Sequence, residues 1–179
     1  MNKRSLLRTL SALLTAALLV LSATPALAEI RVNAADHPVE QGGWYDGMEE
    51  VCVYLATYDE LPDNYLTKSE AEALGWRSSK GNLWDVADGM SIGGDRFGNY
   101  EGLLPDASGR RWTECDIDFD GGYRNGKRVV FSNDGLLYYT GDHYESFEEV
   151  TVVFDGQEGD DEDDSLLGAV IDLLRWFVE

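Results

Sequence analysis

One segment of this 179-residue chain carries acids at the spacing of a β-strand. Residues 110–119 alternate between apolar and acidic side chains, and successive side chains of a strand point to opposite faces. The apolar side chains share one face, which can line a core: Cys115, Ile117 and Phe119. The acids share the other face, which we expect to stay open to solvent: Glu114, Asp116 and Asp118.

Further along the chain come two arginines and a histidine: Arg124, Arg128 and His143. A carboxylate, an imidazole and guanidinium groups are together suited to proton transfer at a phosphodiester. The carboxylate can take a proton from a hydroxyl, the imidazole can protonate a leaving oxygen, and the guanidiniums can stabilise the negative charge that develops. The alternative interpretation is a solvated strand with ordinary surface acids.

The elements that must position these residues predict an α+β domain, with N-terminal helices packed on one face of a twisted antiparallel β-sheet. Apolar residues recur at helical spacing over about 46–58, and Cys52 lies within reach of that stripe. Thr67 and Glu70 have the capping-box pattern that begins a second helix, and a short third helix is expected at 82–87. Strands are predicted further along the chain: 110–119, 127–132, 136–140 and 147–154.

The N-terminal 28 residues have the pattern of a secretory signal peptide. Basic residues come first, a short apolar run follows, and Ala26-Leu27-Ala28 matches a cleavage site. We therefore expect a secreted, extracellular protein that is cleaved after Ala28.

Composition divides the remaining chain into four parts. Residues 29–43 are polar and predict a linker or a short pro-segment, and residues 44–154 form the predicted domain. Residues 155–164 are an acidic low-complexity run that predicts a disordered linker. Residues 165–179 predict a short amphipathic helix, which is too short to span a membrane. This tail is interpreted either as a solubilising spacer or as a segment that folds back over a cationic site.

The charge of the chain limits which partners it can bind. It has 34 acidic residues against 14 Lys and Arg, and its formal net charge is −20. Broad affinity for nucleic acids depends on neutralising phosphates, so the overall charge argues against it. Any chemistry on RNA or DNA must therefore use a locally positive pocket on an acidic body.

Two cysteines remain after the predicted cleavage, Cys52 and Cys115. An exported chain meets an oxidising environment, which favours a Cys52–Cys115 disulfide, and two small buried thiols are the alternative. The first helix is expected to pack on the strand face that carries Cys115, which would bring the pair close enough to bond. The chain has no CxxC pattern and no His/Cys cluster, which argues against a zinc site. We expect no cofactor.

Several collinear motifs resemble one family. The matching segments are 61–71 (LPDNYLTKSEA), 73–76 (ALGW), 79–83 (SKGNL), 91–95 (SIGGD) and 140–144 (TGDHY). They are similar to the secreted bacterial guanyl-preferring ribonucleases of the barnase and binase type. The resemblance covers about residues 44–150 and implies the microbial ribonuclease fold.

The resemblance implies metal-independent cleavage of single-stranded RNA, preferentially after guanosine, through a 2′,3′-cyclic phosphate that is then hydrolysed. It makes Glu114 the general base and His143 the general acid. It implies that three residues bind the phosphate and stabilise the transition state: Lys68, Arg124 and Arg128. It implies that six residues bind the guanine base: Phe97, Gly98, Asn99, Tyr100, Glu101 and Tyr144.

The chain departs from the family pattern in the guanine loop, where Tyr100 replaces an arginine and Gly98 replaces a serine or similar residue. The alternative function is therefore a catalytically weak module of the same fold that binds nucleotides, RNA or an inhibitor. The partners implied by the resemblance are single-stranded RNA and a barstar-like acidic protein inhibitor. We expect a monomer that does not span a membrane.

Overall fold

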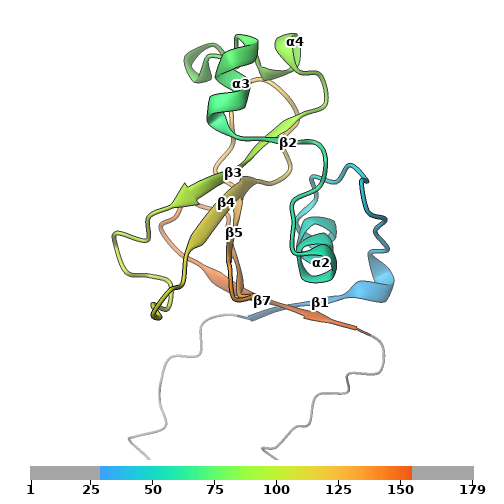
Figure 1. Ribbon diagram of the computed structural model, residues 1–179, viewed down its shortest axis with the longest axis vertical. Helices are drawn as coiled ribbons and strands as arrows, with labels where there is room; N and C mark the ends of the chain where they lie inside the picture. Colours follow the sequence, from blue (N-terminus) through green and yellow to red (C-terminus); the bar gives the residue numbers. More distant parts are fainter. Residues whose placement is uncertain (1–28, 155–179) are drawn as a thin grey trace, which may run out of the picture.

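The computed structural model describes residues 29–154, which form a seven-stranded sheet with helices packed against it (Figure 1). The strands are β1 (Glu29–Asn33), β2 (Tyr65–Leu66), β3 (Ser91–Phe97), β4 (Trp112–Asp116), β5 (Arg128–Ser132), β6 (Leu137–Thr140) and β7 (Glu148–Val153). The helices are η1 (Ala34–Asp36), α2 (Met48–Tyr58), α3 (Lys68–Leu74), η2 (Ser78–Lys80) and α4 (Leu83–Val86). The predicted α+β class is confirmed, and the three helices predicted between residues 46 and 87 are present.

The sheet is mixed, because its central strands are antiparallel and its two edge strands are parallel to their neighbours. Its order is β1-β7-β6-β5-β4-β3-β2. The strands β3 to β7 pair antiparallel, whereas β1 pairs parallel with β7 and β2 pairs parallel with β3. The strand β4, which carries Glu114, pairs with β3 on one side and with β5 on the other, and β6 pairs with β5.

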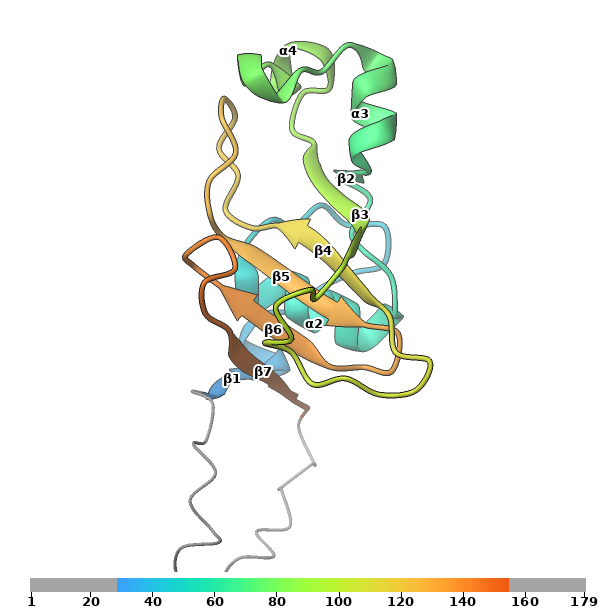
Figure 2. The ribbon, with the colours of Figure 1, turned by 90° about the vertical axis from the view of Figure 1, so that its left-hand side faces the viewer.

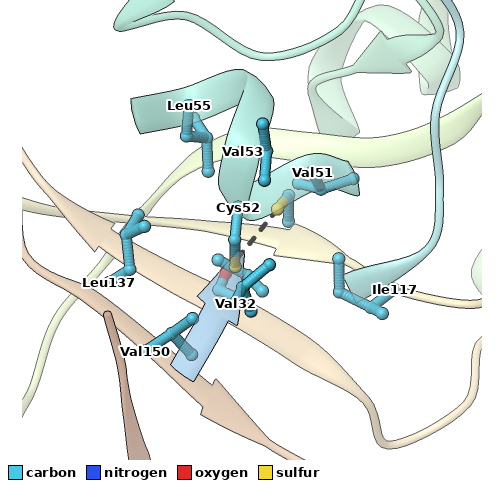
Figure 3. Close-up of a cluster of buried hydrophobic side chains, with 10 residues drawn as sticks. Val32, Val51, Cys52, Val53, Leu55, Ile117, Leu137 and Val150 are labelled. Atoms are coloured by element: carbon cyan, nitrogen blue, oxygen red, sulfur yellow. Dashed lines mark hydrogen bonds between the residues drawn. The ribbon is translucent and has the colours of Figure 1, made fainter. Parts of the chain in front are cut away.

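One face of the sheet is covered by α2, as the periodicity predicted. The helix buries Val51, Cys52 and Leu55 against the sheet (Figure 3). The strand residues of this cluster come from the expected face of the sheet: Cys115, Ile117, Val129, Leu137 and the partly buried Phe131. This packing fixes which side of β4 faces the helix, and so places Glu114 on the opposite side.

The opposite face is not open to solvent, and this expectation was wrong. Figure 2 shows the loop between β3 and β4 lying on the side of the sheet opposite to α2. Its Leu104 packs with side chains of the sheet and of the segment before β7: Trp112, Val130, Tyr138 and Phe147. Under this cover, Glu114 is 6% exposed and Asp116 is 1% exposed. The expectation failed because strand alternation predicts which residues share a face but not which loop covers that face.

The segment 29–43, expected as a linker or short pro-segment, belongs in part to the domain. Residues 29–33 form β1, whose register pairs Val32 with Val152 of β7. Val32 is 3% exposed and lies in the core cluster with α2. The local sequence is polar, but its alternate residues supply the buried face of an edge strand.

The two cysteines lie in the same core cluster and are free thiols, so the predicted Cys52–Cys115 disulfide is absent from the described residues. Both are completely buried among apolar side chains. Burial raises the pKa of the Cys52 thiol to about 12 and raises the pKa of Cys115 well above its ordinary value. Because the thiolate is the reactive form, this environment keeps both groups unreactive.

Three other expectations concern parts of the chain outside residues 29–154: the signal peptide at 1–28, the acidic linker at 155–164 and the helix at 165–179. Within residues 29–154, none of the helices is both long and apolar enough to cross a membrane.

Candidate active site

Glu114 on β4 is the centre of a buried polar cluster. Its Oε1 lies 2.5 Å from the Nζ of Lys68, and its Oε2 accepts a 2.6 Å hydrogen bond from the hydroxyl of Tyr144. The side chain is 8% exposed, whereas that of Lys68 is 39% exposed. The carboxylate is therefore held from both sides, with one cation and one neutral donor.

This arrangement keeps Glu114 ionised despite its burial. Burial alone would raise the pKa of the carboxyl, since it disfavours the charged form. The hydrogen bonds from Lys68 and Tyr144 and the nearby charge of Arg124 outweigh burial, so the pKa of Glu114 is lowered from its ordinary value of 4.5. A carboxylate that is ionised at neutral pH can accept a proton from a substrate hydroxyl.

Lys68 is placed by the start of α3. Thr67 is the N-cap, and the capping box is complete, with reciprocal bonds between Thr67 and Glu70. The backbone N–H of Lys68 also donates a 2.9 Å hydrogen bond to Asp95 of β3. Because Lys68 is the first residue of the helix, these contacts fix the position from which its side chain reaches Glu114.

Asp116 organises the two arginines to which the resemblance assigns phosphate binding, Arg124 and Arg128. Its carboxylate accepts two hydrogen bonds from Arg124, at 2.6 Å from Nε and 2.5 Å from the Nη2 nitrogen. The Nε of Arg128 lies 2.9 Å from the Oδ1 of Asp116. This second contact is a close ion pair without the alignment of a hydrogen bond. Arg128 is 1% exposed, so Asp116 is the counter-ion of a buried guanidinium.

His143 is presented by a tight turn after β6. Its φ of 62° lies in the left-handed region, which residues other than glycine rarely adopt, and the next residue, Tyr144, has a φ of 74°. The carboxylate of Asp142 holds the turn by accepting hydrogen bonds from the backbone N–H groups of Glu145 and Ser146, both at 3.0 Å. The backbone N–H of His143 donates to the carbonyl of Gly126 at 3.0 Å, which ties the turn to the loop before β5. The strained turn thus leaves the imidazole exposed at a fixed place.

The imidazole and both arginines line one hollow of about 410 Å³. Its other lining residues come from η2 and the loop before β5: Ser78, Tyr123, Asn125 and Gly126. Tyr144 links this hollow to the general-base candidate, because its ring centre lies 4.9 Å from that of His143 and its hydroxyl bonds Glu114. The structure therefore brings five of the predicted residues together: Lys68, Glu114, Arg124, Arg128 and His143.

The predicted guanine loop is only partly joined to this cluster. The ring of Phe97 stacks on Tyr144 with centroids 5.2 Å apart, which makes an aromatic platform beside Glu114. Asn99 has a φ of 46° and closes the loop by exchanging two hydrogen bonds with the backbone of Leu104. Tyr100 is 94% exposed and has no ring partner among residues 29–154.

Two residues have roles that the sequence did not indicate. Asp116 was expected on the strand face that stays open to solvent, whereas it is buried and paired with two arginines. Tyr144 was expected to bind the guanine base, and its hydroxyl also donates a hydrogen bond to the carboxylate of Glu114. An available signal was that Asp116 shares a strand face with Glu114 and is followed by two arginines within twelve residues.

Among residues 29–154, no group of His, Cys, Asp and Glu side chains is placed to hold a metal ion.

Comparison with known proteins connects this site to a family. A family profile described as ribonuclease matches residues 49–151. A protein named ribonuclease from Bacillus pumilus is 50% identical over 129 residues, which cover 72% of this chain and 78% of that protein. A ribonuclease from Heyndrickxia coagulans is 56% identical over 106 residues, covering 59% of this chain and 94% of the relative. Guanyl-specific ribonuclease St from Saccharopolyspora erythraea is 39% identical over 61 residues, covering 34% of this chain and 59% of the relative.

Proposed function

The chain belongs to the ribonuclease family, and on this premise we propose how its site cleaves RNA and where it acts. The protein is an endoribonuclease that prefers guanosine, as one of its relatives is named a guanyl-specific enzyme. It cleaves single-stranded RNA on the 3′ side of that nucleotide. The single observation that carries the mechanism is the pairing of Glu114 with Lys68 and Tyr144, because it supplies an ionised base at a buried site.

The first step is transphosphorylation. Glu114 takes the proton of the ribose 2′-hydroxyl, whose oxygen then attacks the adjacent phosphorus. His143 protonates the 5′-oxygen that leaves, and a 2′,3′-cyclic phosphate remains. In the second step the two groups exchange roles, and water opens the cyclic phosphate. General acid and base groups each contribute roughly 10²–10⁴-fold.

The cations of the site stabilise the charge that the phosphorus centre gains during both steps. Arg124 and Arg128 are held rigid by Asp116, so they need no reorganisation as charge develops. Before the reaction, Lys68 pairs with Glu114. When Glu114 takes up the proton and becomes neutral, the positive charge of Lys68 becomes available to the phosphate.

The base of the guanosine binds at the loop of residues 97–101. Glu101 accepts hydrogen bonds from the N1 and N2 edge of guanine, and the stacked rings of Phe97 and Tyr144 provide an apolar platform. Backbone N–H groups of the loop meet O6. Since Tyr100 is exposed, its ring is free to stack on a base, where it substitutes for the cation found in the family.

A dinucleotide panel tests this function. The mature protein should cleave GpN dinucleotides with a higher kcat/KM than ApN dinucleotides and without added metal. Equal turnover of the two sets would overturn the guanosine preference. Binding of GMP without turnover of any dinucleotide would instead support the second candidate, a module of the same fold that binds nucleotides and is catalytically weak, which the exposed Tyr100 favours.

The protein acts outside the cell after removal of residues 1–28. In support of this proposal, every strand that the structure describes lies after Ala28, so cleavage there would remove none of the described sheet. The mass of the secreted protein should correspond to a chain that starts at Glu29. A monomeric state and an acidic protein inhibitor of the barstar type stay predictions.

A further inference from the structure

A second cationic hollow lies beside the guanine loop and is not used in the mechanism above. It has a volume of about 160 Å³, and three arginines line it: Arg96, Arg110 and Arg111. The remaining lining comes from the loop and from the start of β4: Phe97, Gly98, Asn99, Asp106 and Trp112.

The strand β3 connects this hollow to the active site. Arg96 and Phe97 are consecutive in the strand, so their side chains point to opposite faces of the sheet. The ring of Phe97 stacks on Tyr144, which bonds Glu114. Arg96 pairs in register with Thr113, two residues after Arg111, so the two guanidiniums start from the same face. The hollow thus adjoins the base-binding loop from its other side.

The three arginines differ in how their charge is balanced. Arg110 is fixed by Asp134, at 2.9 Å from Nε and 2.7 Å from the Nη2 nitrogen, and by the carbonyl of Pro105. Arg96 and Arg111 are exposed, and their side chains have no hydrogen bond or ion pair with any residue in the range 29–154. The acid that lines the hollow is Asp106, so two unbalanced guanidiniums face one carboxylate.

The catalytic cations are balanced differently. The chain has a net charge of −20, and the cations bonded within the catalytic cluster are paired with acids: Lys68 with Glu114, and Arg124 and Arg128 with Asp116. Planar guanidinium groups match the geometry of phosphate oxygens, and two of them can share one phosphate.

We propose that the hollow formed by Arg96, Arg110 and Arg111 binds a phosphate of the RNA strand beyond the cleaved linkage. This inference rests on the proposed function, because it takes RNA as the substrate. The guanine loop holds the base on one side, and the strand continues over the rim of the loop to this hollow. Arg96 and Arg111 supply the charge, and the fixed Arg110 supplies one wall. This local positive charge increases the affinity of an otherwise acidic protein for longer RNA.

The test compares two substrates and two variants. A GpN dinucleotide has no phosphate beyond the cleaved linkage, whereas a single-stranded hexanucleotide with one guanosine has several. The double variant Arg96→Gln/Arg111→Gln should raise KM for the hexanucleotide by roughly 10-fold and leave kcat/KM for the dinucleotide within about 2-fold. The slope of log(kcat/KM) against log salt for the hexanucleotide should become shallower by about 0.7 for each phosphate that the variant no longer neutralises.

Arg31→Gln is the matched control, because Arg31 is an exposed arginine on β1, at the other edge of the sheet. It removes one charge and should leave the hexanucleotide kinetics unchanged. Arg96→Lys/Arg111→Lys should restore most of the salt slope.

The inference is overturned if the double Gln variant affects both substrates equally, or if Arg31→Gln produces the same loss per charge. Those results are distinct from a failure of the proposed function, in which the unmodified protein cleaves no GpN dinucleotide.

Discussion

Acids that alternate on one strand do different work in this protein. Glu114 is held between Lys68 and Tyr144 and is free to accept a proton, whereas Asp116 is committed to Arg124 and Arg128. The two are separated by one residue and share a face of β4. Residue type therefore does not determine the role here; the partners that other elements bring to each carboxylate do.

Asp116→Asn should be one of the most destabilising single changes in the domain. It removes the counter-ion of Arg128, which is 1% exposed, and an unpaired buried charge costs about 3–5 kcal/mol. Chemical denaturation of the two proteins measures the difference in the free energy of unfolding. Asp118→Asn, which removes an exposed partner of Lys127, is the control and should cost less than about 1 kcal/mol. If both variants lose the same free energy of unfolding, Asp116 does not stabilise the buried arginines.

The lowered pKa of Glu114 predicts how activity and stability depend on pH. The base works only when ionised, so kcat/KM should fall as the pH drops through a pKa below 4.5. The same shift links to folding: a folded pKa below the unfolded value contributes stability that is fully present above the unfolded pKa and is lost as the pH falls through the folded pKa. Lys68→Ala should move the acidic limb of the kcat/KM profile to higher pH. A limb that stays in place would mean that Lys68 does not hold the carboxylate ionised.

The catalytic residue types could be predicted from the sequence, and their burial could not. Strand alternation put Glu114 opposite Cys115, and the helix stripe put Cys52 near Cys115; both placements are correct. Coverage of the Glu114 face depends on Leu104, whose packing against Tyr138 joins segments more than thirty residues apart. No local pattern carries that information.

At the scale of elements, short caps and turns place the reactive groups. The capping box of α3 sets Lys68, and the turn held by Asp142 sets His143. Helices were predictable because their caps and stripes are local signals. The strand β3 was missed because Gly93 and Gly94 interrupt its pattern, and the register shifts there. Close packing requires the first glycine, since a Cβ at Gly93 would lie 2.6 Å from Tyr65 and 2.7 Å from Cys115, and Gly94 has a φ of 92°.

Thr67→Ala tests whether the cap of α3 supports the chemistry. Losing the side-chain bond to the backbone N–H of Glu70 should cost about 1 kcal/mol of stability. Because Lys68 is the next residue, kcat/KM should also fall several-fold, measured under conditions where both proteins are fully folded. Thr67→Ser keeps the hydroxyl and should behave like the parent. A loss of stability with unchanged kcat/KM would mean that the cap stabilises the helix but does not position Lys68 for catalysis.

Across the whole molecule, the sheet separates stability from catalysis. The active-site strands β3, β4 and β5 lie toward one end of the strand order, and β1 is the strand at the other end. The pairing of β1 with β7 joins residues 29–33 to 149–153, which are far apart in sequence. Such a parallel contact could not be predicted from the polar segment that contains it.

Val32→Asp should therefore weaken the fold and spare the chemistry. Val32 is 3% exposed in the core, and burying a carboxylate there without a partner should cost roughly 3 kcal/mol or more. The neighbouring Arg31→Asp changes an exposed position and should cost well under 1 kcal/mol. Thermal unfolding gives the stabilities, and kcat/KM of the folded fraction should be the same for both. A selective drop in kcat/KM for Val32→Asp would mean that β1 affects the site directly.

Cleavage by this site depends on Glu114 as the base that activates the 2′-hydroxyl. The most direct measurement is the pH profile of kcat/KM for GpN cleavage by the parent and by Glu114→Gln, which has nearly the same shape and cannot take up the proton. We predict a loss of at least 10²-fold at neutral pH and the disappearance of the acidic limb. A variant that cleaves within about 3-fold of the parent, with the acidic limb intact, would mean that another group takes the proton.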